Sequence, residues 1–189
     1  MGRGYVLMAV RNGEAHLAEQ MQSFAEQSHT GWDLIASDDG STDRSLAILA
    51  EFAACWSKVP EPHAVTVLNG PCRGFVRNFF HLLRAVPGDA AFAALSDQDD
   101  VWFPDKLQRA LTALAELPEG QPGLYCARSL VCDADLRPLR VSPLFQRPLS
   151  FRNALVQSAG GGNTMVLNAA ALRLVKAALD EAEDSASHD

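Results

Sequence analysis

The chain has 189 residues, of which 48% are hydrophobic and 21% are charged, and its formal net charge is −7 at pH 7. This length supports one domain with a sizeable core, and the composition excludes collagen-like, disordered and disulfide-scaffold proteins. The negative charge disfavours nucleic acid as a partner, and no apolar run approaches the roughly 18 residues of a transmembrane segment. The four cysteines fit neither a zinc site nor a CxxC motif, which predicts free thiols in a reducing cytosol.

Short apolar runs that end in turn residues predict the strands. In chain order they cover residues 5–10, 33–37, 65–68, 91–96, 124–131 and 164–167. Most segments between them carry apolar residues at helical spacing. The expected helices are 14–27, with Leu17, Met21 and Phe24 on one face; one capped by Asp43, with Leu46, Leu49, Ala50 and Ala53 in its stripe; one striped by Val76, Phe79, Phe80 and Leu83; one with Pro104 in its first turn and Leu107, Leu111 and Leu114 in its stripe; and 169–182.

Strands that alternate with helices predict a parallel α/β sheet with right-handed crossovers, in which ligands bind at the carboxyl ends of the strands. The alternation weakens after about residue 133. Residues 137–148 are rich in proline and arginine and are expected to form a loop or an irregular edge. Residues 150–157 predict a short helix capped by Ser150, and the glycines at 160–162 predict a permissive loop before the last strand.

Two acidic turns follow predicted strands: Asp-Asp-Gly-Ser-Thr-Asp at 38–43 and Asp-Gln-Asp-Asp at 97–100. Carboxylates crowded at a strand end repel one another. They are tolerated when a hard cation such as Mg²⁺ or Mn²⁺ sits among them with water and substrate phosphates. For the first turn, capping and turn chemistry are an equal alternative. For the second, the alternative is a solvated loop, which the adjoining Trp102 and Phe103 disfavour. The chain lacks EF-hand, Walker A, Rossmann-glycine and G-x-S-x-G motifs.

In their order along the chain, the motifs resemble family 2 glycosyltransferases, which are nucleotide-sugar enzymes of the GT-A fold. The Ser-Asp-Gln-Asp-Asp-Val-Trp run at 96–102 is most similar to a bacterial rhamnosyltransferase-like branch that builds surface polysaccharides. The resemblance extends almost from end to end. The matching stretches are 9–14, 17–20, 27–29, 35–43, 78–79, 96–102, 104–107, 162–165 and 188–189.

The resemblance implies a single α/β domain of the GT-A type, with a mostly parallel central sheet flanked by helices. A Rossmann-like nucleotide-binding half would cover about 1–105 and an acceptor-side half about 106–189. The implied activity is metal-dependent, inverting transfer of a sugar from a dTDP- or UDP-linked donor to a saccharide or lipid-linked saccharide. We therefore expect a cytoplasmic protein that can work at the inner face of the membrane.

The resemblance also assigns roles to residues. The metal, Mg²⁺ or Mn²⁺, would be held by Asp99 with Asp97 in support, and Asp97 would also adjoin the nucleotide. The catalytic base that deprotonates the acceptor hydroxyl would be Asp189. The remaining nucleotide-binding residues are Val10 and Asn12, which would line the base and ribose; Asp38, for the ribose or the loop; Asp39, for the base N–H; and Arg73 or Arg77, for the phosphates.

One departure from the branch concerns the end of the chain. There the His-Asp pair is usually followed by tryptophans and a further segment, whereas this chain ends at Asp189. We therefore expect a truncated, incomplete acceptor half, which leaves open a non-catalytic nucleotide-sugar-binding fragment. A sugar nucleotidyltransferase is a further alternative, although Arg11-Asn12-Gly13 is a poor substitute for its glycine-rich basic loop. A phosphatase of the Asp-x-Asp type would need its nucleophile where Ser37 stands.

Overall fold

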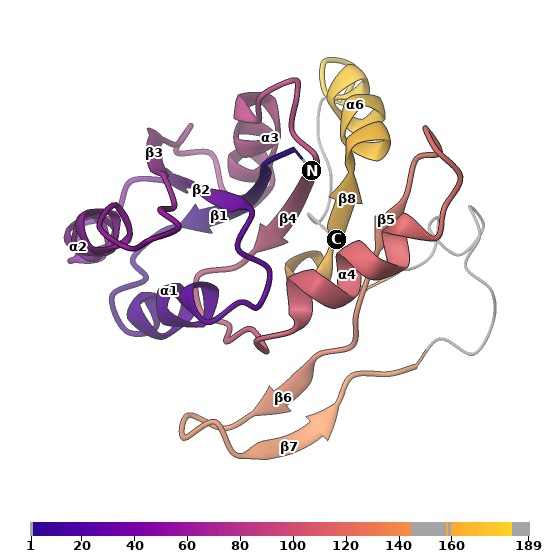
Figure 1. The fold of residues 1–189 in the computed structure, drawn as a ribbon. Coiled ribbons are helices and arrows are strands. Elements are labelled where there is room, and N and C mark those ends of the chain that lie inside the picture. The colour runs from indigo at the N-terminus through magenta and orange to yellow at the C-terminus, as the bar shows by residue number, and fades with distance from the viewer. Residues whose placement is uncertain (1, 145–157, 159, 183–189) are drawn as a thin grey trace.

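The computed structural model describes residues 2–144, 158 and 160–182, and it shows a six-stranded sheet covered by helices on both faces (Figure 1). The strand order is β3-β2-β1-β4-β8-β5. The strands are β1 (Gly4–Val10), β2 (Trp32–Asp38), β3 (Val65–Asn69), β4 (Phe92–Ser96), β5 (Leu124–Tyr125) and β8 (Val166–Asn168). The first four are parallel to one another, and β8 is antiparallel to both β4 and β5.

The helices divide between the two faces of the sheet because its central strands are buried on both sides. Val6 and Met8 of β1 pack in one core cluster with α1 (Leu17–Ala25), α2 (Ser45–Trp56) and α4 (Lys106–Ala115). Leu7, between them, faces the opposite cluster with α3 (Phe75–Ala85) and α6 (Ala169–Ala178). This arrangement confirms the predicted α/β architecture with a mostly parallel sheet.

Several helix details differ from the expectation. The first helix begins at Leu17, later than the predicted residue 14. Asp43 lies one residue before the N-cap position of α2, although its Oδ1 accepts from the Ser45 backbone N–H at 3.0 Å. Leu46 is exposed, because the buried face of α2 carries Ile48 and Leu49 instead. Pro104 precedes α4, so it is not in the first turn of that helix.

The predicted strand at 124–131 is wrong. It is split into β5 and a separate strand, β6 (Leu130–Cys132), which forms an antiparallel hairpin with β7 (Pro138–Val141). The hairpin therefore also replaces part of the loop expected at 137–148. The chain turns away from the main sheet because Ser129 and Ser142 bond to one another: Ser142 N donates to Ser129 O at 2.8 Å and Ser129 N to Ser142 Oγ at 2.9 Å.

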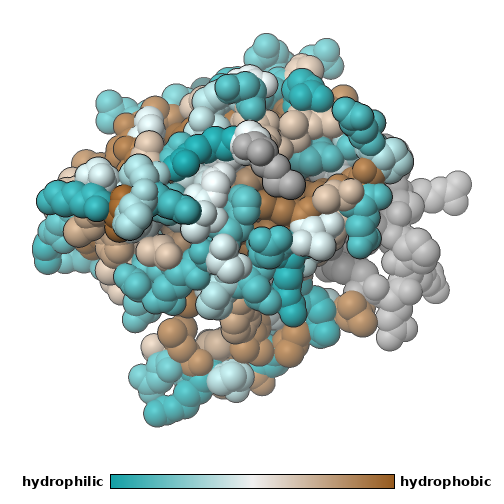
Figure 2. Space-filling view, in the orientation of Figure 1, coloured by the Kyte–Doolittle hydropathy of each residue, from teal (hydrophilic) through white to brown (hydrophobic). Residues whose placement is uncertain are grey.

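The hairpin, defined here as residues 128–142, extends away from the main sheet at the bottom of Figure 1. Brown hydrophobic residues reach its surface among teal ones (Figure 2). Leu136, Leu139 and Val141 are each at least half exposed. The helix expected at 150–157 lies outside the described residues. Every helix that the structure describes is too short or too polar to cross a bilayer.

Candidate functional site

The two acidic turns lie at the same edge of the sheet, as predicted. The register pairs Val10 with Asp38, and Met8 with Ser96, the last residue before Asp97. Because β1 lies between β2 and β4, the turns are two strand spacings apart, or roughly 10 Å. This edge is the carboxyl end of four parallel strands, where open α/β sheets bind ligands.

The loop after β1 is bonded to the loop after β2. Asn12 N donates to Ser41 Oγ and Asn12 Oδ1 accepts from Thr42 N, both at 2.8 Å. Gly13 N donates to Ser45 Oγ at 2.8 Å. Asn12 has φ of 50°, a left-handed conformation that asparagine tolerates better than most residues. Asn12 therefore has a structural role, and its side-chain oxygen is already engaged.

Asp38 and Asp39 hold two different loops. Both carboxylate oxygens of Asp38 accept from Ser41 N, at 3.3 and 3.1 Å, which closes the first acidic turn. Asp39 is buried, and its two oxygens accept from Cys72 N at 2.6 Å and Gly74 N at 3.1 Å. A carboxylate offers about four lone-pair sites, so Asp39 retains acceptor capacity in an orientation that the backbone has fixed.

Gly70 and Asn78 pack against the end of β2 and help to hold Asp38 and Asp39 in place. A Cβ at Gly70 would lie 2.8 Å from Asp38 O and 2.9 Å from Asp39 Oδ1, so the close approach needs glycine. Asn78 is buried and bonds twice to Ser37: its Nδ2 donates to Ser37 O at 2.8 Å, and its Oδ1 accepts from the Ser37 hydroxyl.

Arg73 and Arg77 follow the loop that Asp39 holds. Arg73 is exposed and Arg77, in α3, is half-buried. Arg73 lies in the loop between β3 and α3, and neither side chain is fully buried, so a phosphate could reach both. Their assignment to the phosphates stays a prediction.

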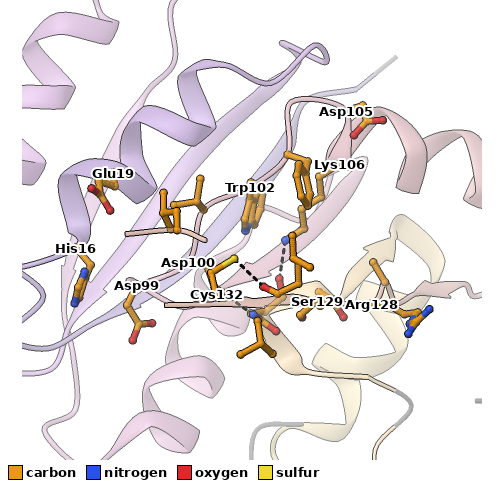
Figure 3. A pocket seen from close by; sticks show the side chains of 18 of the residues that line it. His16, Glu19, Asp99, Asp100, Trp102, Asp105, Lys106, Arg128, Ser129 and Cys132 are labelled. Atoms are coloured by element: carbon orange, nitrogen blue, oxygen red, sulfur yellow. Dashed lines mark hydrogen bonds between the residues drawn. The ribbon is translucent and has the colours of Figure 1, made fainter. Parts of the chain in front are cut away.

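The second acidic turn borders a cleft of about 760 Å³ (Figure 3). Asp99 is exposed and lines this cleft together with the start of α1 and one arm of the hairpin. None of the predicted residues Val10, Asn12, Asp38 or Asp39 lines it. The cleft thus lies beside the predicted nucleotide edge, and Asp99 is the predicted site residue that the cleft contains.

The described residues contain no group of three His, Cys, Asp or Glu side chains placed to hold a metal ion. Asp97 and Asp99 supply carboxylate oxygens from a single turn. Mg²⁺ is commonly bound through one or two carboxylates, with water and substrate phosphates completing its shell. The donor chemistry therefore fits a metal that binds together with a diphosphate.

Sequence reasoning did not assign roles to Lys106, Asn163 or Gln98. Lys106 Nζ donates to Asn163 O at 2.6 Å and lies 3.4 Å from the centroid of the Trp102 ring. Burial lowers the pKa of Lys106 to about 7, and the charges of Asp100 and Asp97 act in the opposite direction. Burial also raises the pKa of Asp100, against the hydrogen bond from Asn163.

A pattern was available for one of these three residues. Gln98 stands between Asp97 and Asp99 in the second acidic turn. A carboxamide at such a position can form hydrogen bonds with a neighbouring backbone while the flanking carboxylates bind a ligand. Nothing local in the sequence places Asn163 against a turn more than sixty residues earlier. Asp189 lies outside the described residues, so its assignment as a base stays a prediction.

Comparison with known proteins matches the chain to one family of sequences. The sequence profile described as "Glycosyl transferase family 2" matches residues 5–177. The dTDP-rhamnosyl transferase RfbG of Shigella flexneri is 34% identical over 110 residues, which make up 57% of this chain and 36% of RfbG. The chain spans little more than a third of the length of the curated relatives it matches first, 36% and 37%.

Solved structures show the same fold. S. aureus TarS, in a crystal structure of its residues 1–349, has a TM-score of 0.67 at 18% identity over 92% of this chain and 49% of that one. The mannosyltransferase PcManGT of Pyrobaculum calidifontis, in complex with GDP-Man and Mn²⁺, has a TM-score of 0.52 at 22% identity over 60% of this chain and 32% of that one. These likenesses confirm the predicted GT-A architecture.

Proposed function

This chain belongs to glycosyl transferase family 2, and we propose that it acts as an inverting glycosyltransferase in surface polysaccharide synthesis. The donor is a nucleotide-diphosphate sugar, dTDP- or UDP-linked, and the acceptor is a saccharide or lipid-linked saccharide. The observation that carries the proposal is the convergence of two acidic turns at one sheet edge, with Asp39 oriented by the backbone and Asp99 exposed in a cleft.

Nucleotide recognition uses the edge formed by β1 and β2. Asp39 accepts a hydrogen bond from a base N–H, because Cys72 N and Gly74 N hold its carboxylate in one orientation. Asp38 and Asn12 shape the loops around the base and ribose, and Val10, which pairs with Asp38 in the sheet, adjoins them. Binding should lose little conformational entropy in these loops, because their hydrogen bonds already fix them in the free protein.

The metal is Mg²⁺ or Mn²⁺, with Asp99 as its main ligand and Asp97 in support. Bound there, it would neutralise charge on the leaving diphosphate. Arg73 or Arg77 adds positive charge near the phosphates. The PcManGT complex with Mn²⁺ supports a divalent cation in proteins of this fold.

The acceptor hydroxyl attacks the sugar carbon from the side opposite the diphosphate, and this single in-line displacement inverts the configuration. The base is Asp189, which takes the hydroxyl proton as the new bond forms. We assign the acceptor to the cleft beside Asp99, because the proposed metal ligand lines it. In a form of the protein that transfers sugar, Asp189→Asn should lose turnover and keep donor affinity, and a fully active variant would remove Asp189 from the site.

The experiment that tests this function is a thermal-shift panel of UDP, dTDP, GDP and CDP, each with and without Mn²⁺. We expect one or two nucleotides to raise the melting temperature, and to do so only with Mn²⁺. No shift with any nucleotide would contradict the proposal. Release of pyrophosphate from a nucleoside triphosphate and a sugar phosphate would favour a nucleotidyltransferase instead.

A further inference from the structure

The second acidic turn is held from two sides, at positions other than the proposed metal ligands. On the first side, the Gln98 carboxamide pairs with the backbone of Arg11: its Oε1 accepts from Arg11 N at 2.8 Å and its Nε2 donates to Arg11 O at 3.0 Å. Gly13 permits this pairing, since a Cβ there would lie 2.7 Å from Gln98 Oε1. The turn is thereby tied to the loop after β1.

On the second side, Asp100 is tied to the loop before β8. Asn163 Nδ2 donates to Asp100 Oδ2 at 2.6 Å, and Lys106 Nζ donates to the Asn163 carbonyl at 2.6 Å. Lys106 is held in turn against the ring of Trp102, which is only 4% exposed. In Figure 3, Trp102 and Lys106 lie side by side, and Asp99 lies apart from them toward His16.

Successive residues of the turn have two different roles. Gln98 and Asp100 hold other loops, whereas Asp99 between them is exposed to the cleft. Three carboxylates within four residues repel one another, so an untethered turn would spread them apart. Tethering at both sides keeps the carboxylates of Asp97 and Asp99 near the sheet edge before any cation binds. A site that is already in place binds its cation more tightly.

We propose that Gln98 and the Asp100–Asn163 pair are positioning residues that clamp the second acidic turn between the loop after β1 and the loop before β8, so that Asp99 is presented at a fixed place in the cleft. Asp100 is therefore not a metal ligand. This inference rests on the proposed function for the role of Asp99, whereas the clamp itself is a property of the free protein.

A swap of the hydrogen-bonding pair tests the clamp. In Asn163→Asp two carboxylates face each other without a donor, and we expect the affinity for UDP or dTDP with Mn²⁺ to fall about tenfold, as for the loss of a bond to a charged group. In Asp100→Asn an amide still accepts from Asn163, and affinity should stay within about threefold. The double variant Asp100→Asn/Asn163→Asp reverses donor and acceptor and should recover affinity to the same extent.

The swap separates positioning from metal binding. A metal ligand at position 100 would make Asp100→Asn as damaging as Asp99→Ala, and the double variant would not recover. Either result would overturn the clamp. Asp89→Asn, an exposed carboxylate on the loop before β4, serves as the matched control and should bind like the unaltered chain.

Hydrogen exchange on the free protein tests the clamp without any nucleotide. Asn163→Asp should speed exchange in residues 97–106 and 160–165 together, and the double variant should restore both. Gln98→Ala should speed exchange in 97–106 and 11–13 and leave 160–165 unchanged. If no nucleotide binds, the proposed function fails and the exchange pattern still decides the clamp. Unchanged exchange in 97–106 in both single variants would overturn the inference.

Discussion

The loops at the carboxyl ends of β1 and β2 and the hairpin of β6 and β7 are built in opposite ways. The first loops are bonded to each other through Asn12 and to the segment after β3 through Asp39. Asp38 closes its own turn, and buried Asn78 bonds α3 to Ser37 at the end of β2. The hairpin is joined across its own two arms: Arg128 Nε and Nη2 donate to Ser142 O at 2.8 and 2.6 Å. Its strands β6 and β7 are three and four residues long, and all of β7 is exposed.

Under the proposed function, this difference would separate recognition of the donor from recognition of the acceptor. A nucleotide diphosphate has fixed chemistry, and fixed hydrogen-bonding groups suit it. Buried polar networks hold such groups firmly, because each unmet bond is costly. A short exposed hairpin gives a cleft wall that can change in sequence without unfolding the sheet, and binding specificity commonly lies in such segments. We therefore expect substitutions in the first region to act on stability and donor affinity together, and those in the hairpin to leave both intact.

The largest effect on stability is expected at Asn78. Asn78→Ala leaves Ser37 O and its hydroxyl without their buried partner, and each unmet group costs about 1–3 kcal/mol, so the free energy of unfolding should fall by about 2–4 kcal/mol. Urea denaturation measures this loss. Asn69→Ala, at an exposed position on the edge strand β3, is the matched control. A loss at Asn78 no larger than that at Asn69 would mean that the region is not held by its buried network.

Asp39 should affect nucleotide binding next. The carboxamide in Asp39→Asn turns one N–H donor group toward a backbone N–H and weakens the contact with the base. A charged hydrogen bond contributes about 1.5–3 kcal/mol, so UDP or dTDP affinity should fall roughly 10- to 150-fold. Calorimetry gives the affinity, and circular dichroism checks that the variant is folded. Normal binding by a folded variant would assign Asp39 a purely structural role.

Lys106 lies in α4 beside the second acidic turn, and it should give stability a dependence on pH. Its folded pKa of about 7 lies below the ordinary value of 10.5. Between these values the unfolded state binds more protons than the folded one, so stability should rise as pH rises from 7 toward 10.5. The slope has a ceiling of roughly 1.4 kcal/mol per pH unit. Urea midpoints at pH 7 and 9 should therefore differ more in the unaltered chain than in Lys106→Met, and equal differences would contradict this.

The smallest effect is expected in the hairpin. Leu139 is 65% exposed, so Leu139→Ser should change the free energy of unfolding by less than about 0.5 kcal/mol and leave nucleotide affinity unchanged. The same two assays used for Asn78 and Asp39 apply. A loss comparable with that of Asn78→Ala would show that the hairpin is as firmly integrated as the first region, and the comparison would fail.

The sequence predicted the first region well because its information is local. Doubly buried strands appear as continuous apolar runs, and the glycines and aspartates of 38–43 mark a turn wherever they stand. The same apolar criterion failed at 124–131, because a run of apolar residues does not say which strand it pairs with. There, bonds between Ser129 and Ser142 turn the chain into the hairpin.

For the candidate site, the sequence predicted the position of the two acidic turns but not the long-range bonds that hold the second one. The acidic turns were placed at one edge because strand ends of a parallel sheet coincide. The bonds of Asp100 to Asn163 and of Gln98 to Arg11 join residues 63 and 87 positions apart. Such long-range pairings have no periodicity to reveal them.

The most direct test of the account is calorimetric titration of UDP and dTDP, with and without Mn²⁺, into the unaltered chain, Asp99→Ala, Asp97→Ala and the control Asp89→Asn. We predict that Asp99→Ala abolishes the metal dependence of binding, that Asp97→Ala weakens it, and that Asp89→Asn leaves it unchanged. Unchanged Mn²⁺-dependent affinity in a folded Asp99→Ala variant would contradict the assignment of the acidic turn as the metal and diphosphate site.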